Sequence, residues 1–157
     1  MALSKIVSGG QTGVNRAALD AAMAVNLACG GWIPADRKAE DGLIPERYPL
    51  TPLLGGGARQ RTLNNVRDSD GTALLFHELL TGGTKLTRDL CIREKKPFIV
   101  LDAAQISVER AIKAVVRFIE ENDIQVLYVA GPRASGWPEG YAFAVEVIGG
   151  VIRKTQM

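Results

Sequence analysis

The residues best suited to bind a ligand are two groups of glycines, each of which comes directly before a predicted helix. The first group is Gly9-Gly10-Gln11-Thr12-Gly13, which follows a short apolar segment, and the second is Gly82-Gly83-Thr84. Glycines at the start of a helix leave its free backbone N–H groups open to an anion. Each turn alone is equally consistent with a tight connection that binds nothing. The first turn also lacks the spacing of the dinucleotide and phosphate-loop motifs.

Three arginines are candidates for binding the same anion, because a guanidinium can donate two parallel hydrogen bonds to a phosphate. Arg16 lies in the first turn of the first predicted helix, and Arg61 belongs to a basic cluster before a predicted strand. Arg133 follows the last predicted strand, beside Pro132. Each arginine could instead be solvated, but two glycine turns and Arg133 at three strand ends together favour a binding crevice.

Acidic residues offer a weaker signal for chemistry. Asp68, Ser69 and Asp70 could orient a sugar hydroxyl, a metal or a ring nitrogen, and they could equally form a capping turn. Glu40 and Asp41 lie in a long loop, where nothing pairs them with a proton-transfer partner. The sequence therefore assigns no catalytic residue.

A metal site is not predicted. Cys29 and Cys91 are far apart in the sequence, and His77 is the single histidine of the chain. We expect Cys91 to be a small buried residue and His77 to be a structural imidazole. Trp32 and Trp137 could stack on a flat ring, although packing in the core or at an interface is the simpler expectation.

Composition limits the class of protein. The chain has 157 residues, of which 46% are apolar and 23% charged, with a formal net charge of +2. The charge is too small for general nucleic-acid binding, and no apolar run approaches the roughly 18 residues that span a bilayer. The N-terminus lacks the apolar core of a signal peptide. We therefore expect a cytoplasmic protein that binds neither nucleic acid nor membranes.

Short apolar strands alternate with helical periods along the chain, which predicts βαβ units and a parallel sheet. The expected strands are 5–8, 31–34, 72–76, 98–101 and 126–130. The expected helices are 14–27, 59–67, 82–95, one that begins at 107 and one that begins near 139. Gly149-Gly150 is expected to end the last helix early, and residues 35–58 form a long loop of the kind that is often functional. The prediction is a single Rossmann-like domain over 1–157, an α/β protein with a three-layer α/β/α sandwich around a five-stranded, mainly parallel sheet.

With these residues assembled, the chain resembles the family of molybdenum-cofactor carrier proteins, whose fold is similar to that of the lysine-decarboxylase-like cytokinin phosphoribohydrolases. The resemblance covers nearly the whole chain. The matching segments are 8–20, 30–34, 37–42, 44–45, 47–50, 61–62, 65–66, 68–72, 80–84 and 130–133.

The resemblance implies a Rossmann-like fold, a homo-oligomer of two or four subunits, and a phosphate-bearing pterin, the molybdenum cofactor (molybdopterin), as bound ligand. A phosphorylated small molecule is thus the expected partner. The candidate binding residues, from the turns and the resemblance together, are Gly9, Gly10, Gln11, Thr12, Gly13, Arg16, Arg61, Asp70, Gly82, Gly83, Thr84 and Arg133.

Two departures from the family pattern bear on catalysis. Asn15 stands where the family usually has aspartate, and an amide neither takes up nor releases a proton at neutral pH. The loop from Gly82 to Asp89 lacks one glycine and the glutamate of the phosphoribohydrolase motif, although Asp89 could partly replace that glutamate. A carrier is therefore the leading hypothesis. The alternatives are a nucleotide hydrolase that uses Glu40, Asp70 or Asp89, and a nucleotide sensor.

Overall fold

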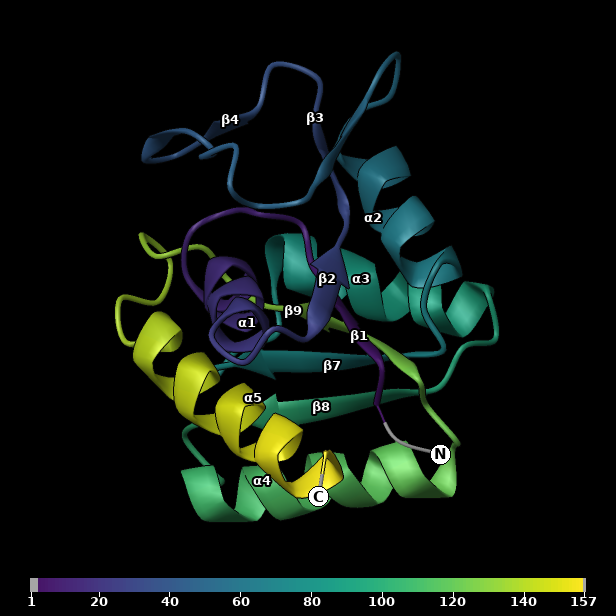
Figure 1. Cartoon of the computed structure of the whole chain (residues 1–157), viewed down its shortest axis with the longest axis vertical. Coiled ribbons are helices and arrows are strands. Elements are labelled where there is room, and N and C mark those ends of the chain that lie inside the picture. The colour runs from purple at the N-terminus through teal and green to yellow at the C-terminus, as the bar shows by residue number, and fades with distance from the viewer. Residues whose placement is uncertain (1–2, 157) are drawn as a thin grey trace.

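The central sheet has five parallel strands in the order β2-β1-β9-β7-β8, as seen in the computed structural model, which describes residues 3–156 (Figure 1). These strands are β1 (Lys5–Val7), β2 (Ala28–Gly30), β7 (Gly71–Phe76), β8 (Phe98–Asp102) and β9 (Val126–Ala130). The predicted α/β class and the five-stranded sheet are confirmed. The domain predicted over 1–157 also includes residues 1, 2 and 157, which lie outside the described residues.

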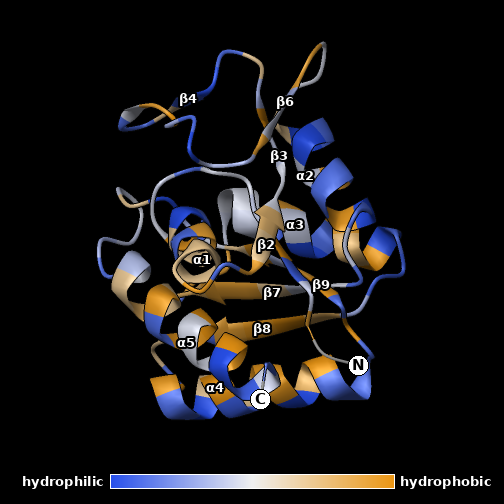
Figure 2. Ribbon diagram, in the orientation of Figure 1, coloured by the Kyte–Doolittle hydropathy of each residue, from blue (hydrophilic) through white to orange (hydrophobic). Residues whose placement is uncertain are grey.

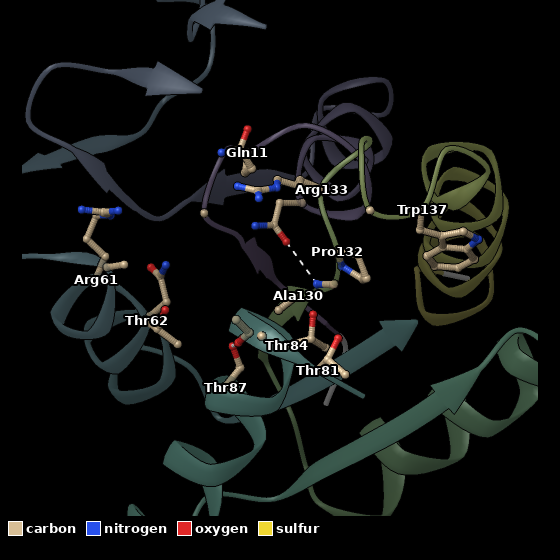
Figure 3. A pocket seen from close by; sticks show the side chains of 18 of the residues that line it. Gln11, Arg61, Thr62, Thr81, Thr84, Thr87, Ala130, Pro132, Arg133 and Trp137 are labelled. Carbon is tan, nitrogen blue, oxygen red and sulfur yellow. Dashed lines mark hydrogen bonds between the residues drawn. The ribbon is translucent and has the colours of Figure 1, made fainter. Parts of the chain in front are cut away.

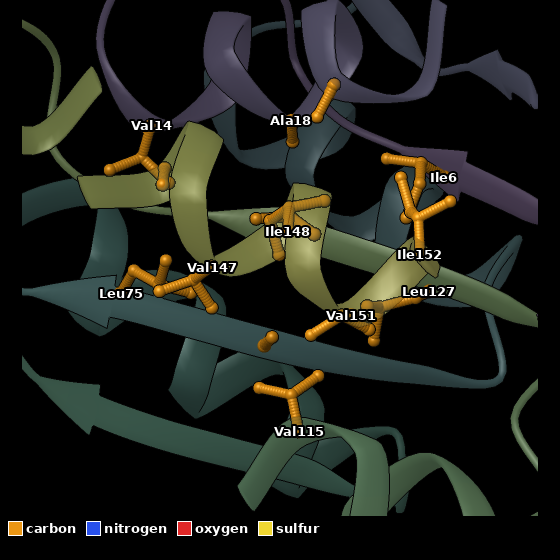
Figure 4. Close-up of a cluster of buried hydrophobic side chains, with 14 of the residues drawn as sticks. Ile6, Val14, Ala18, Leu75, Val115, Leu127, Val147, Ile148, Val151 and Ile152 are labelled. Atoms are coloured by element: carbon orange, nitrogen blue, oxygen red, sulfur yellow. The ribbon is translucent and has the colours of Figure 1, made fainter. Parts of the chain in front are cut away.

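Helices cover both faces of this sheet. They are α1 (Val14–Met23), α2 (Ala58–Arg67), α3 (Gly82–Arg93), α4 (Val108–Glu121) and α5 (Gly140–Thr155). Side chains of α1, α4 and α5 pack on one face in the largest buried cluster (Figure 4). Side chains of α2 and α3 pack on the other face with Leu74 and Tyr128. Because successive strand residues point to opposite faces, Leu74 and Leu75 of β7 serve different layers. The result is the predicted three-layer sandwich.

The apolar pattern of the sequence explains why β7 lies inside the sheet. All six residues of β7 are buried, since strands flank it on both sides and helices cover both faces. Figure 2 shows β7 and β8 as hydrophobic strands, in contrast to the hydrophilic outer surfaces of the helices.

The last helix does not end at Gly149-Gly150, so that prediction is wrong. α5 continues to Thr155, and Gly150 lies in the contact between α5 and α4. A Cβ atom on Gly150 would lie 2.3 Å from Cδ1 of Ile112, so the glycine permits the close approach of the two helices. Helix packing, rather than helix termination, accounts for this glycine.

The second strand of the sheet is also not where the sequence predicts it. α1 ends at Met23 instead of residue 27, and residues 28–30 pair with β1. Gly31 then turns the chain away from the sheet with a φ of +145°, where a Cβ would lie 1.8 Å from the carbonyl oxygen of Ser8. The predicted segment 31–34 contributes instead β3 (Trp32–Pro34), which pairs with β6 (Thr51–Leu53) in a separate small sheet.

The expected long loop at 35–58 contains short strands. β4 (Lys38–Ala39) and β5 (Gly42–Leu43) form an antiparallel hairpin, drawn at the top of Figure 1. Ile44, Tyr48 and Leu50 anchor the segment in a small cluster with Leu19 and Ile33. No helix among residues 3–156 is long and apolar enough to cross a membrane.

Candidate functional site

A pocket of about 730 Å³ opens at the carboxyl ends of β1, β7 and β9. The chain runs from β1 outward to β2, and from β7 outward to β8 in the opposite direction, so the strand order reverses at this point. Open α/β sheets bind ligands at such a reversal. The start of α3, the inner side of α2 and the segment 32–44 complete the walls (Figure 3).

Seven of the twelve predicted binding residues line this pocket. They are Gly9, Gln11, Arg61, Gly82, Gly83, Thr84 and Arg133. The other five do not line it, and they are Gly10, Thr12, Gly13, Arg16 and Asp70. The contacts that these five residues make with the rest of the protein explain why they do not line the pocket.

The start of α3 is open toward the pocket. The N-cap residue Thr81 makes no side-chain cap, and Gly82, Gly83 and Thr84 carry the first backbone N–H groups, which have no acceptor within the helix. By contrast, Ser107 caps α4 by accepting a hydrogen bond from the N–H of Arg110. The α3 terminus therefore offers both N–H groups and the positive end of the helix dipole to a ligand.

Thr84 adds an unused hydroxyl to this end of the pocket. Its side chain lines the pocket although the residue is only 6% exposed, and its Oγ1 has no hydrogen-bond partner among the described residues. The Oγ1 of Thr84 is not among the buried side-chain atoms that lack a partner, so this oxygen is open to the pocket. A ligand at the α3 terminus would supply a partner.

The start of α1 is closed by protein. The N–H of Val14 donates to the carbonyl oxygen of Pro132 at 3.4 Å, and the N–H of Arg16 donates to that of Gln11 at 2.9 Å. A Cβ on Gly13 would lie 2.6 Å from the Pro132 oxygen, so the glycine serves the packing of two loops. The side chain of Thr12 bonds to Glu40 and to the N–H of Ala134. The first glycine turn thus presents Gly9 and Gln11, but not its helix terminus, to the pocket.

Arg16 and Asp70 both bond to other parts of the protein, and these bonds explain why neither side chain lines the pocket. The Nε of Arg16 donates to the carbonyl oxygen of Gly10 at 3.0 Å, and its two terminal nitrogens bond to Asp41 at 3.1 and 3.3 Å. The carboxylate of Asp70 accepts hydrogen bonds from the N–H groups of Gln125 and Val126, at the amino end of β9 and hence at the opposite end of the sheet. Of the two interpretations for Asp70, the structural turn fits these contacts.

The pocket lining carries more positive than negative charge. Lys38, Arg61 and Arg133 line it together with one carboxylate, Glu78, whose side chain is 69% exposed. The side chain of Arg133 is also largely exposed, and its Nε lies 3.7 Å from a carboxylate oxygen of Glu40. Solvent-facing cations next to an open helix terminus suit an anionic ligand.

Glu40 lies in the β4–β5 hairpin and joins it by hydrogen bonds to Thr12 and Ser135, beside the pocket. It accepts hydrogen bonds from the hydroxyl of Thr12 and from both the N–H and the hydroxyl of Ser135, the latter two at 2.9 and 2.7 Å. The Thr12 hydroxyl and then the Ser135 groups lower the pKa of Glu40 to about 2. Glu40 is therefore an ionised structural anchor at neutral pH and not a proton donor.

Sequence reasoning missed several lining residues. His77 directly follows β7 and lines the pocket next to Trp137, with 6.1 Å between the ring centroids. The expected structural imidazole has a side chain that is 44% exposed at the pocket. Its position at the carboxyl end of a central strand was the available signal.

The floor of the pocket includes Tyr128 of β9, which sequence reasoning treated only as a strand residue. Burial raises the pKa of Tyr128 to about 12, and hydrogen bonds with Thr87, Asn65 and Thr62 oppose that shift. The phenol therefore remains protonated at physiological pH. Thr87 and Asn65 also line the pocket, so the floor is polar but uncharged.

No thiol lines the pocket. Cys91 is buried as predicted, and burial raises its pKa. Cys29 is half-buried at β2. No cluster of three or more histidine, cysteine or acidic side chains able to hold a metal occurs within residues 3–156.

Comparison with known proteins shows the family of the chain and a similar fold. The sequence model of the circularly permutated YpsA SLOG family matches residues 6–152, which is most of the chain. The chain belongs to this family. Its sheet places β9, the last strand of the SLOG chain, between β1 and β7.

A solved structure is also similar to this SLOG protein. It is the crystal structure of a protein named putative molybdenum carrier protein, from Syntrophus aciditrophicus SB. The two share 42% sequence identity over 96% of this chain and 95% of the other, with a TM-score of 0.92. The resemblance to the molybdenum carrier family is thereby confirmed. None of the curated proteins that were searched matches the SLOG chain.

Proposed function

We propose that the protein binds a phosphate-bearing small molecule, with the phosphate at the start of α3. The observation that carries the proposal is the uncapped helix terminus at Gly82–Thr84, which opens into a pocket that Thr84 also lines. A phosphate there would accept hydrogen bonds from the free N–H groups and from Thr84. Arg61, which lines the same pocket from α2, would neutralise part of its charge.

The ligand we infer is the molybdenum cofactor, carried or stored as cargo. The similar solved structure bears the name of a molybdenum carrier, and the cofactor is an anionic pterin with a terminal phosphate. A volume of about 730 Å³ lies in the range typical of small-molecule sites. Because no cysteine lines the pocket, the protein would hold the cofactor by its phosphate and pterin, and the molybdenum would keep its own ligands.

A carrier fits the lining better than a hydrolase does. None of the carboxylates considered for proton transfer, Glu40, Asp70 or Asp89, lines the pocket. Asp89 instead accepts hydrogen bonds from Arg88. Incubation with a panel of nucleoside monophosphates tests the alternative, because release of free base would contradict a pure carrier.

Isothermal titration with molybdopterin and with inorganic phosphate tests the binding proposal. Arg61→Ala should weaken both by about 1.5–3 kcal/mol, the value of a hydrogen bond to a charged group. Arg117→Ala is the matched control, because Arg117 lies on α4 and pairs only with Glu121 among the described residues. The proposal fails if neither ligand binds at millimolar concentration, or if both arginine variants behave alike.

Two further parts of the proposal are the assembly, which rests on the family resemblance, and the location, which rests on the composition. We infer a homo-oligomer of two or four subunits and a cytoplasmic location. Light scattering coupled to size-exclusion chromatography measures the first, and a monomer would contradict it. Fractionation of cells that express the tagged protein measures the second.

A further inference from the structure

The amide side chains of the pocket all use their oxygen on the protein backbone. The Oε1 of Gln11 accepts hydrogen bonds from the N–H groups of Thr12 and Glu40 at 3.0 and 2.9 Å. The Oδ1 of Asn15 accepts one from the N–H of Gly131 at 3.3 Å. Only an amide oxygen can accept from an N–H group, so these bonds fix which way each amide is turned.

The nitrogens of Gln11 and Asn15 are consequently the groups that remain for a ligand. Gln11 and Asn15 both line the pocket. The Nδ2 of Asn15 lies 3.2 Å from the position that a Cβ on Gly9 would take, so the missing side chain of Gly9 leaves this nitrogen uncovered. Asn65 differs, because its Oδ1 accepts from the N–H of Trp32 at 2.8 Å and its Nδ2 also donates to the carbonyl oxygen of Trp32 at 3.5 Å.

Few hydrogen-bond acceptors balance these donors. The one lining carboxylate, Glu78, is largely exposed and lies 3.7 Å from His77. Glu40 is close to Arg133 but directs its oxygens to Thr12 and Ser135. Because the charged and amide side chains of the lining are mainly donors, the pocket favours ligands that are rich in acceptors, since each donor left without an acceptor after burial weakens binding.

The donors lie at two separate places. Figure 3 shows Gln11 and Arg133 together on one side of the pocket, while Thr81, Thr84 and Thr87 lie around the start of α3 on the other side. One anionic group at α3 would therefore leave the amide and guanidinium donors of the opposite wall unused.

We propose that the Nε2 of Gln11, the Nδ2 of Asn15 and the guanidinium of Arg133 form a second anion subsite. The ligand then carries two anionic groups, one at each subsite, such as a condensed phosphate or a phosphate linked to a second anion. This inference rests on the proposed function for the first subsite and extends it. It assigns Asn15 a role in specificity, since aspartate of the same shape would present an acceptor there.

Titration calorimetry with orthophosphate, pyrophosphate and tripolyphosphate tests the second subsite. For the natural chain, the tighter of the two condensed phosphates should bind at least about tenfold more strongly than orthophosphate. Asn15→Asp and Gln11→Glu keep the backbone-bonded oxygen, but each replaces the amide donor with a negatively charged oxygen. Each should reduce the ratio between condensed-phosphate and orthophosphate affinity by about tenfold or more, since it also adds a repelling charge.

Two controls separate the possible failures. Asn122→Asp adds the same charge at the end of α4, away from the pocket, and should leave the affinity ratio unchanged. Thr84→Val should weaken every phosphate, because it acts at the first subsite. If orthophosphate does not bind the natural chain, the proposed function itself fails. If orthophosphate binds but neither condensed phosphate binds more tightly, or if both amide variants keep the natural ratio, the second subsite is overturned.

Discussion

Glu40 accepts two hydrogen bonds from Ser135, from its N–H at 2.9 Å and from its hydroxyl at 2.7 Å. The contact joins the β4–β5 hairpin to the loop that precedes α5, two parts of the chain 95 residues apart. Since Lys38 and Arg133 lie in these segments and line the pocket, the contact sets the relative position of two cations.

This contact predicts a pH dependence. The hydrogen bonds lower the pKa of Glu40 from its ordinary value of 4.5 to about 2, so ionised Glu40 stabilises the fold above pH 4.5 and loses that effect as the pH falls toward 2. Thermal unfolding of the natural chain and of Glu40→Gln should therefore differ most above pH 4.5 and converge near pH 2. A difference that stays constant over this range would contradict the prediction.

Arg16 should matter for stability rather than for the ligand. Its side chain is 11% exposed, and its removal leaves the carbonyl oxygen of Gly10 and the carboxylate of Asp41 without these partners. We expect Arg16→Ala to lower the free energy of unfolding by about 1–3 kcal/mol in urea denaturation. The phosphate affinity of Arg16→Ala should change less than that of Arg61→Ala. A larger change would show that Arg16 contacts the ligand.

Thr84→Val should separate binding from folding. Valine keeps the shape of threonine and removes a hydroxyl that makes no hydrogen bond among the described residues. Phosphate affinity should fall by about three- to tenfold, the effect of one neutral hydrogen bond, while the melting temperature stays the same or rises. A lower melting temperature would show that the hydroxyl has a structural partner.

The neighbouring glycines of α5 provide a matched pair. Alanine at Gly149 would contact only the end of Arg153 at 3.5 Å, whereas alanine at Gly150 would overlap Ile112. We expect Gly149→Ala to raise the free energy of unfolding by about 0.5–1 kcal/mol, because alanine favours helix. Gly150→Ala should lower it by about 1–3 kcal/mol through overpacking. Equal effects in urea denaturation would contradict the proposed helix contact.

The sequence predicted those elements whose signal is local. The strand at 126–130 has the same bounds in the structure, and the helix predicted over 59–67 begins one residue earlier. Ala28–Gly30 was missed as a strand because three small residues after a helix carry no apolar pattern, and their pairing with β1 is a tertiary contact.

The site was predictable in kind but not in detail. Both glycine turns have the residues of an anion-binding helix start, and nothing near Gly13 in the sequence distinguishes them. The difference arises from the carbonyl oxygen of Pro132, which occupies the start of α1 and has no counterpart among the described residues at α3. A contact between segments so far apart leaves no trace in local composition.

The central position of β9 has a consequence for synthesis of the chain. β1 and β2 can pair as they emerge from the ribosome, and so can β7 and β8, but neither pair contacts the other within the sheet. The pair β1–β2 and the pair β7–β8 therefore each keep an unpaired inner edge until β9 emerges and pairs with β1 and β7. The nascent protein is therefore most exposed to aggregation just before its last strand is made, and slow translation ahead of residue 126 would lengthen that interval.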